Sequence, residues 1–282
     1  MDSKTGIRIV VCANTVGEWL GLRDIRELSA QALRCDAGVM GGKADLFVLF
    51  GGGVIGSVEV LAQAMERGIA HEYAVVGGRG HATYGLERAV ARLWAECGNP
   101  ASLPDPKIAS EAEMLSAVLQ MRHGVVPDFL ETRSTNCGNN IAYLLDALDE
   151  RESVPGSVVL CQDAAMQRRM DATWRRQVRD RPRHAGTRVV NWASYQARLA
   201  WCNGTLVFED APWGMWEPRR YLSLLLGDVA RLTDDAHGYG PRGADYIDHV
   251  DVPDDVRDAW LELRSLLPDD QRLFPTDPRV GD

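Results

Sequence analysis

The sequence predicts an α/β protein with a mainly parallel sheet, and two observations carry that prediction. Short β-prone apolar runs alternate with segments whose apolar residues recur at helical spacing, and the first two runs end in glycine. Strands that are separated by helices form right-handed βαβ units, which produce parallel sheets. The predicted strands are residues 44–50, 73–76, 129–131, 158–161 and 189–192.

Predicted helices follow these strands in order. Val58, Leu61 and Met65 mark the first helix, and Gly68 is well placed to end it. A Ser-x-x-Glu capping box at residues 110–113 predicts the start of another helix. Further helices of this part are expected around residues 86–94, 141–148 and 166–174.

The pattern changes after Tyr195. The stretch that contains Trp201, Trp213 and Trp216 has irregular periodicity, and helical faces follow at 221–232 and 254–267 with a Gly- and Asp-rich loop at 233–245 between them. The predicted organisation is an N-terminal helical segment (1–43), an α/β core (44–195), a C-terminal helical extension packed on the core (196–267) and a flexible tail (268–282).

Composition narrows the classes of function. The chain has 31 Lys and Arg residues against 40 Asp and Glu residues, a net charge of −9, which disfavours sequence-independent nucleic-acid binding. No apolar run approaches the ~20 residues of a membrane-spanning helix, and residues 1–10 show no export-signal pattern. The six cysteines are scattered without a Cys-x-x-Cys pair, so we expect reduced thiols and a cytoplasmic location.

Three polar turns follow predicted strands, where open parallel sheets bind their ligands. Gly51-Gly52-Gly53 precedes a helix, so its N–H groups favour a carboxylate or a phosphate; the alternative is a tight turn without a ligand. In the second turn, Gly77-Gly78-Arg79-Gly80-His81, the alternative for Arg79 and His81 is a surface charge and a helix cap. The third turn, residues 134–140, holds more hydrogen-bonding side chains than the capping of one helix needs. Its Cys137 is either a nucleophile near a helix N-terminus or a packed small residue, and the second interpretation is favoured because no base is assigned to it.

Several familiar sites do not fit this sequence. Gly51, Gly53 and Gly56 match the dinucleotide spacing Gly-x-Gly-x-x-Gly, but the second strand ends in Val76-Gly77 with no acid to hold ribose hydroxyls. No Lys-Ser/Thr follows the glycines, no Gly-x-Ser-x-Gly is present, and the six histidines are isolated, so no metal site is expected. The basic stretch 168–188 is interrupted by acids, which favours a solvated helix face over a nucleic-acid groove.

Five motifs resemble the YdcF branch of the SanA/ElyC/YdcF family of bacterial proteins. In the family's order they are Ser134-Thr135-Asn136-Cys137-Gly138-x-Asn140, Gln162-Asp163-x-x-Met166-Gln167-Arg168-Arg169, Arg220-Tyr221-Leu222-Ser223-Leu224-Leu225, Gly238-Tyr239-Gly240-Pro241-Arg242-Gly243 and His249-Val250-Asp251. The resemblance implies a Rossmann-like three-layer α/β fold and binding of S-adenosylmethionine (SAM) without an established reaction. Relatives outside the branch place His where Met166 stands, and without that imidazole a hydrolytic reaction lacks its most natural general base.

The resemblance also implies that SAM binds at the polar turns. The expected cofactor-binding residues are Gly51, Gly52, Gly53, Gly77, Gly78, Gly80, His81, Ser134, Thr135, Asn136, Asn140, Gln162, Asp163, Met166, Arg168, Arg169, Tyr239 and Arg242. Among them, we expect Asn136, Asn140 and Asp163 to fix the polar end of the ligand, and Arg168, Arg169 and Arg242 to hold an anionic group.

Some of these roles have alternatives. Glu111 and Glu113 begin a helix that is expected to face the same ligand, although Glu113 also suits the capping box alone. Arg242 suits either a lid over the ligand or a structural turn. The candidate catalytic residues are Asp163, Arg169 and Glu113.

Three functional classes stay open. The first, which we prefer, is a SAM-binding protein, either with or without an enzymatic use of SAM on a small acceptor. The second is a hydrolase or transferase of a nucleotide or a phosphorylated envelope precursor, and the third is a non-catalytic ligand sensor. The expected partners are a small-molecule ligand and a second copy of the chain in a homodimer, with no nucleic acid.

Overall fold

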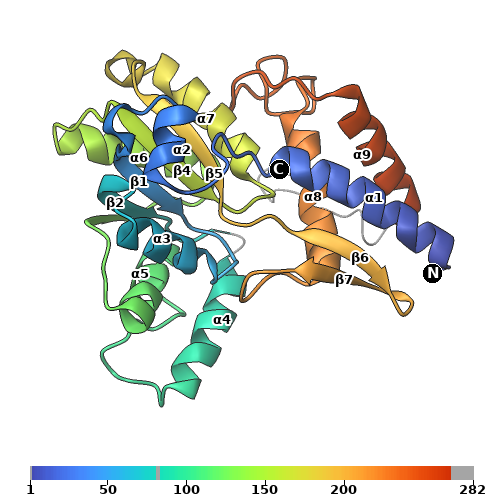
Figure 1. Cartoon of the computed structure of the whole chain (residues 1–282), viewed down its shortest axis with the longest axis horizontal. Helices are drawn as coiled ribbons and strands as arrows, with labels where there is room; N and C mark the ends of the chain where they lie inside the picture. The colour runs from blue at the N-terminus through green and yellow to red at the C-terminus, as the bar shows by residue number, and fades with distance from the viewer. Residues whose placement is uncertain (1, 81–82, 268–282) are drawn as a thin grey trace, which may run out of the picture.

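Five parallel strands form the centre of the molecule (Figure 1). The computed structural model describes residues 2–80 and 83–267. Its sheet has the strand order β3-β2-β1-β4-β5, and every neighbouring pair is parallel. The strands are β1 (Ala44–Phe50), β2 (Ala70–Val76), β3 (Phe129–Glu131), β4 (Ser157–Gln162) and β5 (Arg188–Ala193). The structure confirms the predicted α/β fold with a parallel sheet.

The chain changes direction across the sheet at β1. Strands β2 and β3 are added on one side of β1, whereas β4 and β5 are added on the other side. Leu46 of β1 therefore pairs with both Glu72 of β2 and Val158 of β4. Sheets of this kind bind ligands outside the carboxyl ends of the strands at the point where the strand order reverses. That point lies here at the ends of β1 and β4.

Helices cover both faces of the sheet (Figure 1). They are α2 (Ala30–Cys35), α3 (Ser57–Glu66), α4 (Thr83–Glu96), α5 (Glu111–His123), α6 (Cys137–Glu150) and α7 (Gln167–Arg179), with 3-10 turns at Met40–Gly42 and Pro182–His184. Successive side chains of a strand point to opposite faces. Phe47 and Leu49 accordingly pack in one cluster with α2 to α5, while Val48 and Phe50 pack in another with α6 and α7. The result is the predicted Rossmann-like three-layer arrangement.

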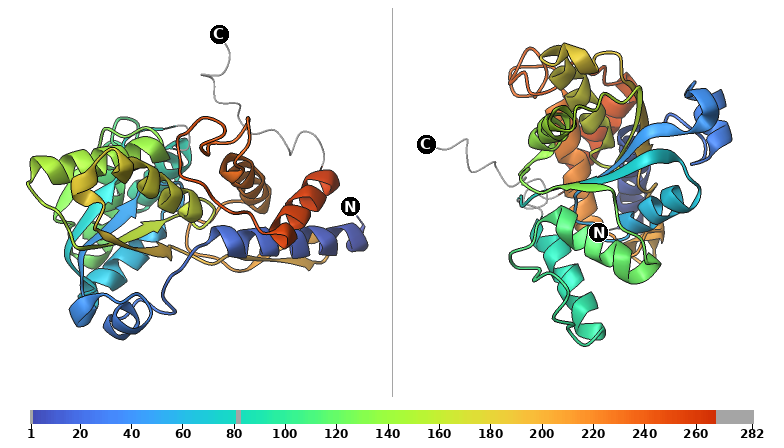
Figure 2. Two further views of the ribbon diagram at one scale, coloured as in Figure 1. Left: turned by 90° about the horizontal axis from the view of Figure 1, so that it is seen from above. Right: turned by 90° about the vertical axis from the view of Figure 1, so that its left-hand side faces the viewer.

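The first helix and the last helices pack together beside the sheet (Figure 2). These helices are α1 (Ser3–Leu20), α8 (Pro218–Leu232) and α9 (Asp254–Leu266). Ile9 and Val16 of α1 share a buried cluster with Leu225 of α8 and Leu263 of α9. The two ends of the described chain thus form one hydrophobic unit, which reaches the sheet through Ala164 and Ala193.

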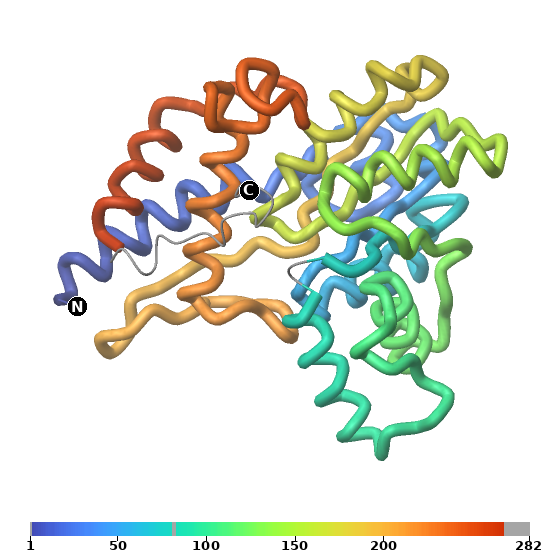
Figure 3. The backbone as a smooth tube through the Cα atoms, turned by 180° about the vertical axis from the view of Figure 1, so that it is seen from behind, coloured from blue at the N-terminus to red at the C-terminus, as the bar shows by residue number. Residues whose placement is uncertain are grey.

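An antiparallel hairpin lies in the stretch for which the sequence indicated only irregular periodicity (Figure 3). Its strands are β6 (Arg198–Cys202) and β7 (Thr205–Asp210), and β6 packs on α1. Asn203 and Gly204 connect them with φ values of 50° and 82°. Two consecutive positive φ angles are typical of the tight type I′ hairpin turn. The region 196–267 is therefore not helical throughout.

The other predicted elements lie close to their expected positions. Strand β2 begins at Ala70, earlier than predicted, and Gly68 with φ 61° ends α3 as expected. The capping box at the start of α5 is present. Helix α6 begins at Cys137, so the second half of the predicted polar turn 134–140 is the first turn of this helix.

Two further sequence expectations concern the C-terminal tail and membrane-spanning helices. The tail at 268–282 lies outside the described residues. Within residues 2–80 and 83–267, no helix is both long enough and apolar enough to cross a bilayer.

Candidate functional site

Four bends meet at the carboxyl-end edge of the sheet. They are residues 51–53 after β1, 77–80 after β2, 134–136 after β3 and 162–163 at the end of β4, and we call them the four bends. The Gly51 N–H donates to the Val76 carbonyl at 2.6 Å, and Gln162 Nε2 donates to the Gly51 carbonyl at 3.1 Å. The Gly78 N–H donates to Ser134 Oγ at 3.0 Å. Segments that are far apart in the sequence are thus bonded to one another at this edge.

The bend after β1 carries backbone donors without partners. The N–H groups of Gly52, Gly53, Val54 and Ile55 make no hydrogen bond to any described residue, although Gly53, Val54 and Ile55 are buried. Buried backbone N–H groups are nearly always paired in folded proteins. The run lies directly before α3, whose N-terminal end favours negative charge. This loop, residues 51–56, is therefore suited to a carboxylate or a phosphate, and we call it the glycine loop.

Close packing explains why two positions of the glycine loop are glycine. A Cβ on Gly51 would collide with the carboxylate of Glu111, and a Cβ on Gly53 would collide with the indole of Trp216. A Cβ on Gly52, in contrast, would lie 3.4 Å from Gln162 Oε1, which is an ordinary contact. Gly52 thus retains space beside its N–H group.

Glu111 places a carboxylate next to Gly51. Its side chain is buried, with 8% of the residue exposed, and Oε1 accepts a hydrogen bond from Thr83 Oγ1 at 2.6 Å. Among the described residues, no donor forms a hydrogen bond to Oε2. Burial raises the pKa of Glu111, and the Thr83 hydroxyl and the charge of Arg79 oppose that rise. The sequence had placed this residue at the start of a helix facing the ligand but not among the binding residues.

Asp163, at the end of β4, is enclosed by its own contacts. Oδ1 accepts hydrogen bonds from the Tyr195 hydroxyl and, at 3.0 Å, from the Ala165 N–H. Oδ2 accepts one from Trp216 Nε1 at 3.0 Å. Burial raises the pKa of Asp163, while the Tyr195 and Trp216 hydrogen bonds lower it. Both oxygens are used within the chain, so Asp163 joins β4 to the elements that follow β5.

Trp216 covers the glycine loop from the segment between β7 and α8. Its ring lies against Gly53 and, less tightly, against Gly85. The guanidinium of Arg220 lies 5.7 Å from the centre of this ring, and its Nε is buried without a partner among the described residues. Arg220 is therefore a cation, with a donor that has no described partner, beside the ring that covers the glycine loop.

The predicted polar turn after β3 is largely used by the fold. Ser134 holds Gly78, and Asn136 caps α6 by accepting from the Asn139 N–H at 3.0 Å. Thr135 Oγ1 accepts from Asn139 Nδ2 at 3.2 Å. Asn140 differs because it is 6% exposed and its amide makes no hydrogen bond to a described residue. Of this turn, Asn140 is the side chain that keeps its hydrogen-bonding groups available.

The two arginines that open α7 bind parts of the chain. Arg168 Nε donates to the Trp19 carbonyl at 2.7 Å, and its guanidinium lies 4.5 Å from the Trp19 ring centre. Arg169 Nε forms an ion pair with the buried Asp228 of α8 at 2.5 Å. The structure thus attaches Arg168 to α1 and Arg169 to α8.

The remaining predicted residues have other settings. Met166 is half-buried and is the residue before α7. Arg242 is exposed beside Asp234, and the Tyr239 hydroxyl accepts from Arg231 Nε at 3.3 Å. In the described chain, no hydrogen bond or ion pair joins Tyr239 or Arg242 to the four bends. His81 lies outside the described residues.

Two further candidates, Glu113 and Cys137, have environments that favour a structural role. Glu113 Oε2 accepts from the Ser110 N–H and hydroxyl, both at 2.7 Å, and these hydrogen bonds lower the pKa of Glu113. Burial raises the pKa of the Cys137 thiol, although Arg169 opposes this, so the thiolate is disfavoured. Within the described ranges, no three His, Cys, Asp or Glu side chains are arranged to hold a metal ion.

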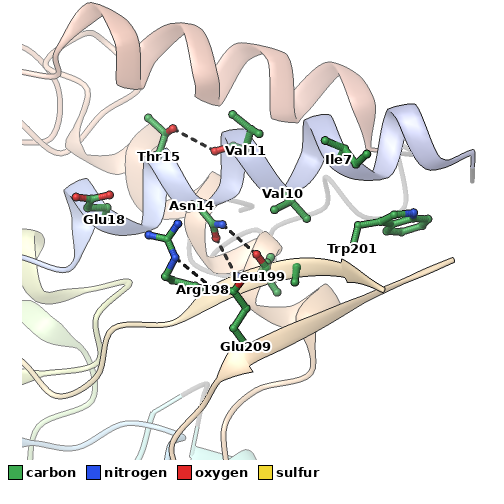
Figure 4. Close-up of a pocket in the computed structure, with 11 residues that line it drawn as sticks. Ile7, Val10, Val11, Asn14, Thr15, Glu18, Arg198, Leu199, Trp201 and Glu209 are labelled. Carbon is green, nitrogen blue, oxygen red and sulfur yellow. Dashed lines mark hydrogen bonds and ion pairs between the residues drawn. The ribbon is translucent and has the colours of Figure 1, made fainter. Parts of the chain in front are cut away.

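A groove of about 470 Å³ lies elsewhere, between α1 and β6 (Figure 4). Its floor includes Asn14, whose amide exchanges two hydrogen bonds with the backbone of Leu199 at 3.0 and 2.8 Å. Ile7 and Val11 line it and are more than half exposed. None of its lining residues belongs to the four bends.

Several polar groups at or beside the carboxyl-end edge of the sheet are therefore available to hold a ligand. They are the glycine-loop N–H groups, Glu111, Asn140 and Arg220. No family model matches this chain.

Proposed function

We propose that this chain binds SAM at the carboxyl-end edge of its sheet, as its resemblance to YdcF-like proteins implies. The observation that carries the proposal is the run of N–H groups from Gly52 to Ile55 that have no partner among the described residues, at the point where the strand order reverses. These donors suit the carboxylate of the methionyl part of SAM. Arg220, whose Nε has no described partner, adds a positive charge beside the Trp216 ring that covers the loop.

The groups that are available match SAM better than a polyphosphate. A nucleotide triphosphate carries several negative charges, and such sites supply cations to balance them. Arg79, Arg168 and Arg169 are instead bonded to carbonyls or carboxylates of the chain. The Glu111 carboxylate repels the several negative charges of a polyphosphate more strongly than the single carboxylate of SAM, and it can accept hydrogen bonds from a hydroxyl or an ammonium group.

The proposal covers binding and assigns no reaction. Bound SAM supplies a sulfonium whose methyl group is activated for transfer. Asp163 and Glu113, two of the candidate catalytic residues, use their carboxylates in contacts within the chain, and Arg169 is paired with Asp228. Membership in the YdcF branch, a cytoplasmic location and a homodimer stay predictions that accompany this proposal.

Calorimetry with SAM, S-adenosylhomocysteine and ATP tests the proposal. We expect the wild type to bind the first two more tightly than ATP, and native mass spectrometry to show any ligand that remains bound after purification. Gly52→Ala adds a methyl group beside the unpaired N–H groups without a clash, so it should weaken binding by about tenfold or more. Gly186→Ala is the control, since a Cβ there meets nothing within 4 Å.

Two results would contradict the proposal. If the wild type binds neither SAM nor S-adenosylhomocysteine, the chain is not a SAM-binding protein. If ATP or a phosphate ester binds more tightly than SAM, the site belongs to the nucleotide or envelope-precursor class instead.

A further inference from the structure

The glycine pattern of the sequence lacks an acidic residue at the end of the second strand, and Glu111 of α5 supplies one. The second strand ends in Val76-Gly77, where a dinucleotide-type site would place its acidic residue. In the structure, the Glu111 N–H donates to the Gly78 carbonyl at 2.9 Å, and the Ala112 N–H donates to the Gly77 carbonyl at 2.8 Å. These two bonds tie the first turn of α5 to the bend after β2. The Glu111 side chain consequently lies between the ends of β1 and β2.

Packing confirms this position for the carboxylate. A Cβ on Gly77 would lie 3.1 Å from Glu111 Cβ, and a Cβ on Gly51 would lie 2.9 Å from the same atom and still closer to Oε2. Glycine at both positions allows the acid to approach the strand ends. The unpaired N–H groups begin at Gly52, the next residue along the chain.

One oxygen of the Glu111 carboxylate has no hydrogen-bond donor among the described residues. More than nine-tenths of Glu111 is buried, and Thr83 is its only hydrogen-bond donor among the described residues. The nearby Arg79 donates to the Pro106 carbonyl at 3.1 Å and the Ala109 carbonyl at 2.6 Å, and pairs with Glu87 at 3.0 Å. A carboxylate oxygen can accept hydrogen bonds from hydroxyl groups. A ligand with neighbouring hydroxyl groups would satisfy it.

We propose that Glu111 accepts hydrogen bonds from the 2′- and 3′-hydroxyls of the ribose of the adenosine ligand, an inference that rests on the proposed SAM binding. Oε2 and the second lone pair of Oε1 are the acceptors. The ligand then contacts two parts of the same edge: its carboxylate binds the glycine loop, and its ribose binds Glu111 at the start of α5. Glu111 is a specificity residue that selects ribose over deoxyribose.

The test compares S-adenosylhomocysteine with its 2′-deoxyribose analogue by calorimetry. The wild type should prefer the ribose ligand by about tenfold or more, as expected for a hydrogen bond to a charged group. Glu111→Gln should lose most of that preference and bind S-adenosylhomocysteine correspondingly more weakly. Glu113→Gln is the matched control, since it makes the same change in the same helical turn at a carboxylate bound to Ser110. Circular dichroism and thermal melting confirm that both variants are folded.

Each other outcome has a defined meaning. If Glu111→Gln binds S-adenosylhomocysteine with the wild-type preference for ribose, Glu111 does not contact the hydroxyls and this inference is wrong while SAM binding stands. If the variant weakens both ligands equally, Glu111 contacts a different part of the ligand, such as its ammonium group, and the inference is also wrong. If the wild type binds neither SAM nor S-adenosylhomocysteine, both proposals fail.

Discussion

Glu111→Gln is expected to stabilise the ligand-free protein, and the gain should increase with pH. Burial raises the pKa of Glu111 above its ordinary value of 4.5. A carboxyl whose folded-state pKa is raised favours the folded state below the unfolded pKa, and that contribution is lost as pH rises through the folded pKa. Gln keeps the acceptor for Thr83 and carries no charge at any pH. The variant therefore avoids the penalty that the wild type pays above about pH 4.5.

The structure sets the size of this effect. For a single group, the free energy of unfolding changes by at most about 1.4 kcal/mol per pH unit between the two pKa values. Glu111 has one hydrogen-bond donor and no ion pair with a described residue, so the total is of the order of 1–3 kcal/mol. A chain of this size melts about 2–4 °C higher for each kcal/mol. The variant should thus melt several degrees higher at pH 8 and near the wild-type temperature at pH 4.

Urea unfolding of ligand-free protein from pH 4 to pH 8.5 measures the difference, with Glu113→Gln as the control. Hydrogen bonds from Ser110 lower the pKa of Glu113, so its contribution is present above the unfolded pKa and lost as pH falls through the folded pKa. Its replacement should therefore lower stability at neutral pH, which is the opposite sign. A pH-independent difference for Glu111→Gln, or a less stable variant at pH 8, would refute the reasoning.

Two other predictions concern packing and a buried ion pair. Gly53→Ala should destabilise the protein by about 1–3 kcal/mol because its methyl group overlaps the Trp216 ring. Gly52→Ala, in contrast, should melt within a few degrees of the wild type. Equal melting temperatures of the two variants would contradict this prediction. Asp228→Asn should lower the free energy of unfolding in urea by about 3–5 kcal/mol because it leaves the Arg169 guanidinium buried without its counter-ion. The double variant Arg169→Met, Asp228→Leu should recover most of that loss. A double variant as unstable as Asp228→Asn would contradict this prediction.

The sheet was predictable because its strands are short, apolar and separated by helices. Residues 46–50 are buried on both faces, which gives a continuous apolar run without alternation. The hairpin β6-β7 was not found, because its side chains are only partly buried and alternate weakly. The pair Asn203-Gly204 is a strong hairpin signal in the sequence and would have identified the turn.

Only the general location of the site could be predicted from the sequence. The meeting of the four bends follows from the rule that parallel strands end at one edge. The hydrogen bonds between Ser134 and Gly78, or between Arg169 and Asp228, join residues that are 56 and 59 positions apart. No spacing in the sequence identifies such pairs. The same holds for Glu111, whose position depends on the two hydrogen bonds that fix α5 to the bend after β2.

Contacts of α7 and of the end of β4 with other parts of the chain remove three expected ligand-binding residues from the candidate site. Asp163, Arg168 and Arg169 were expected to hold the ligand, but they bind Trp216, Trp19 and Asp228 respectively. Each of these partners belongs to α1 or to the chain after β5, so the three residues attach that hydrophobic unit to the end of the sheet. Their replacement should therefore change stability before it changes ligand selectivity. Among the described residues, the N–H groups of the glycine loop, the Asn140 amide and one carboxylate oxygen of Glu111 have no such structural role, and ligand selectivity should depend on them.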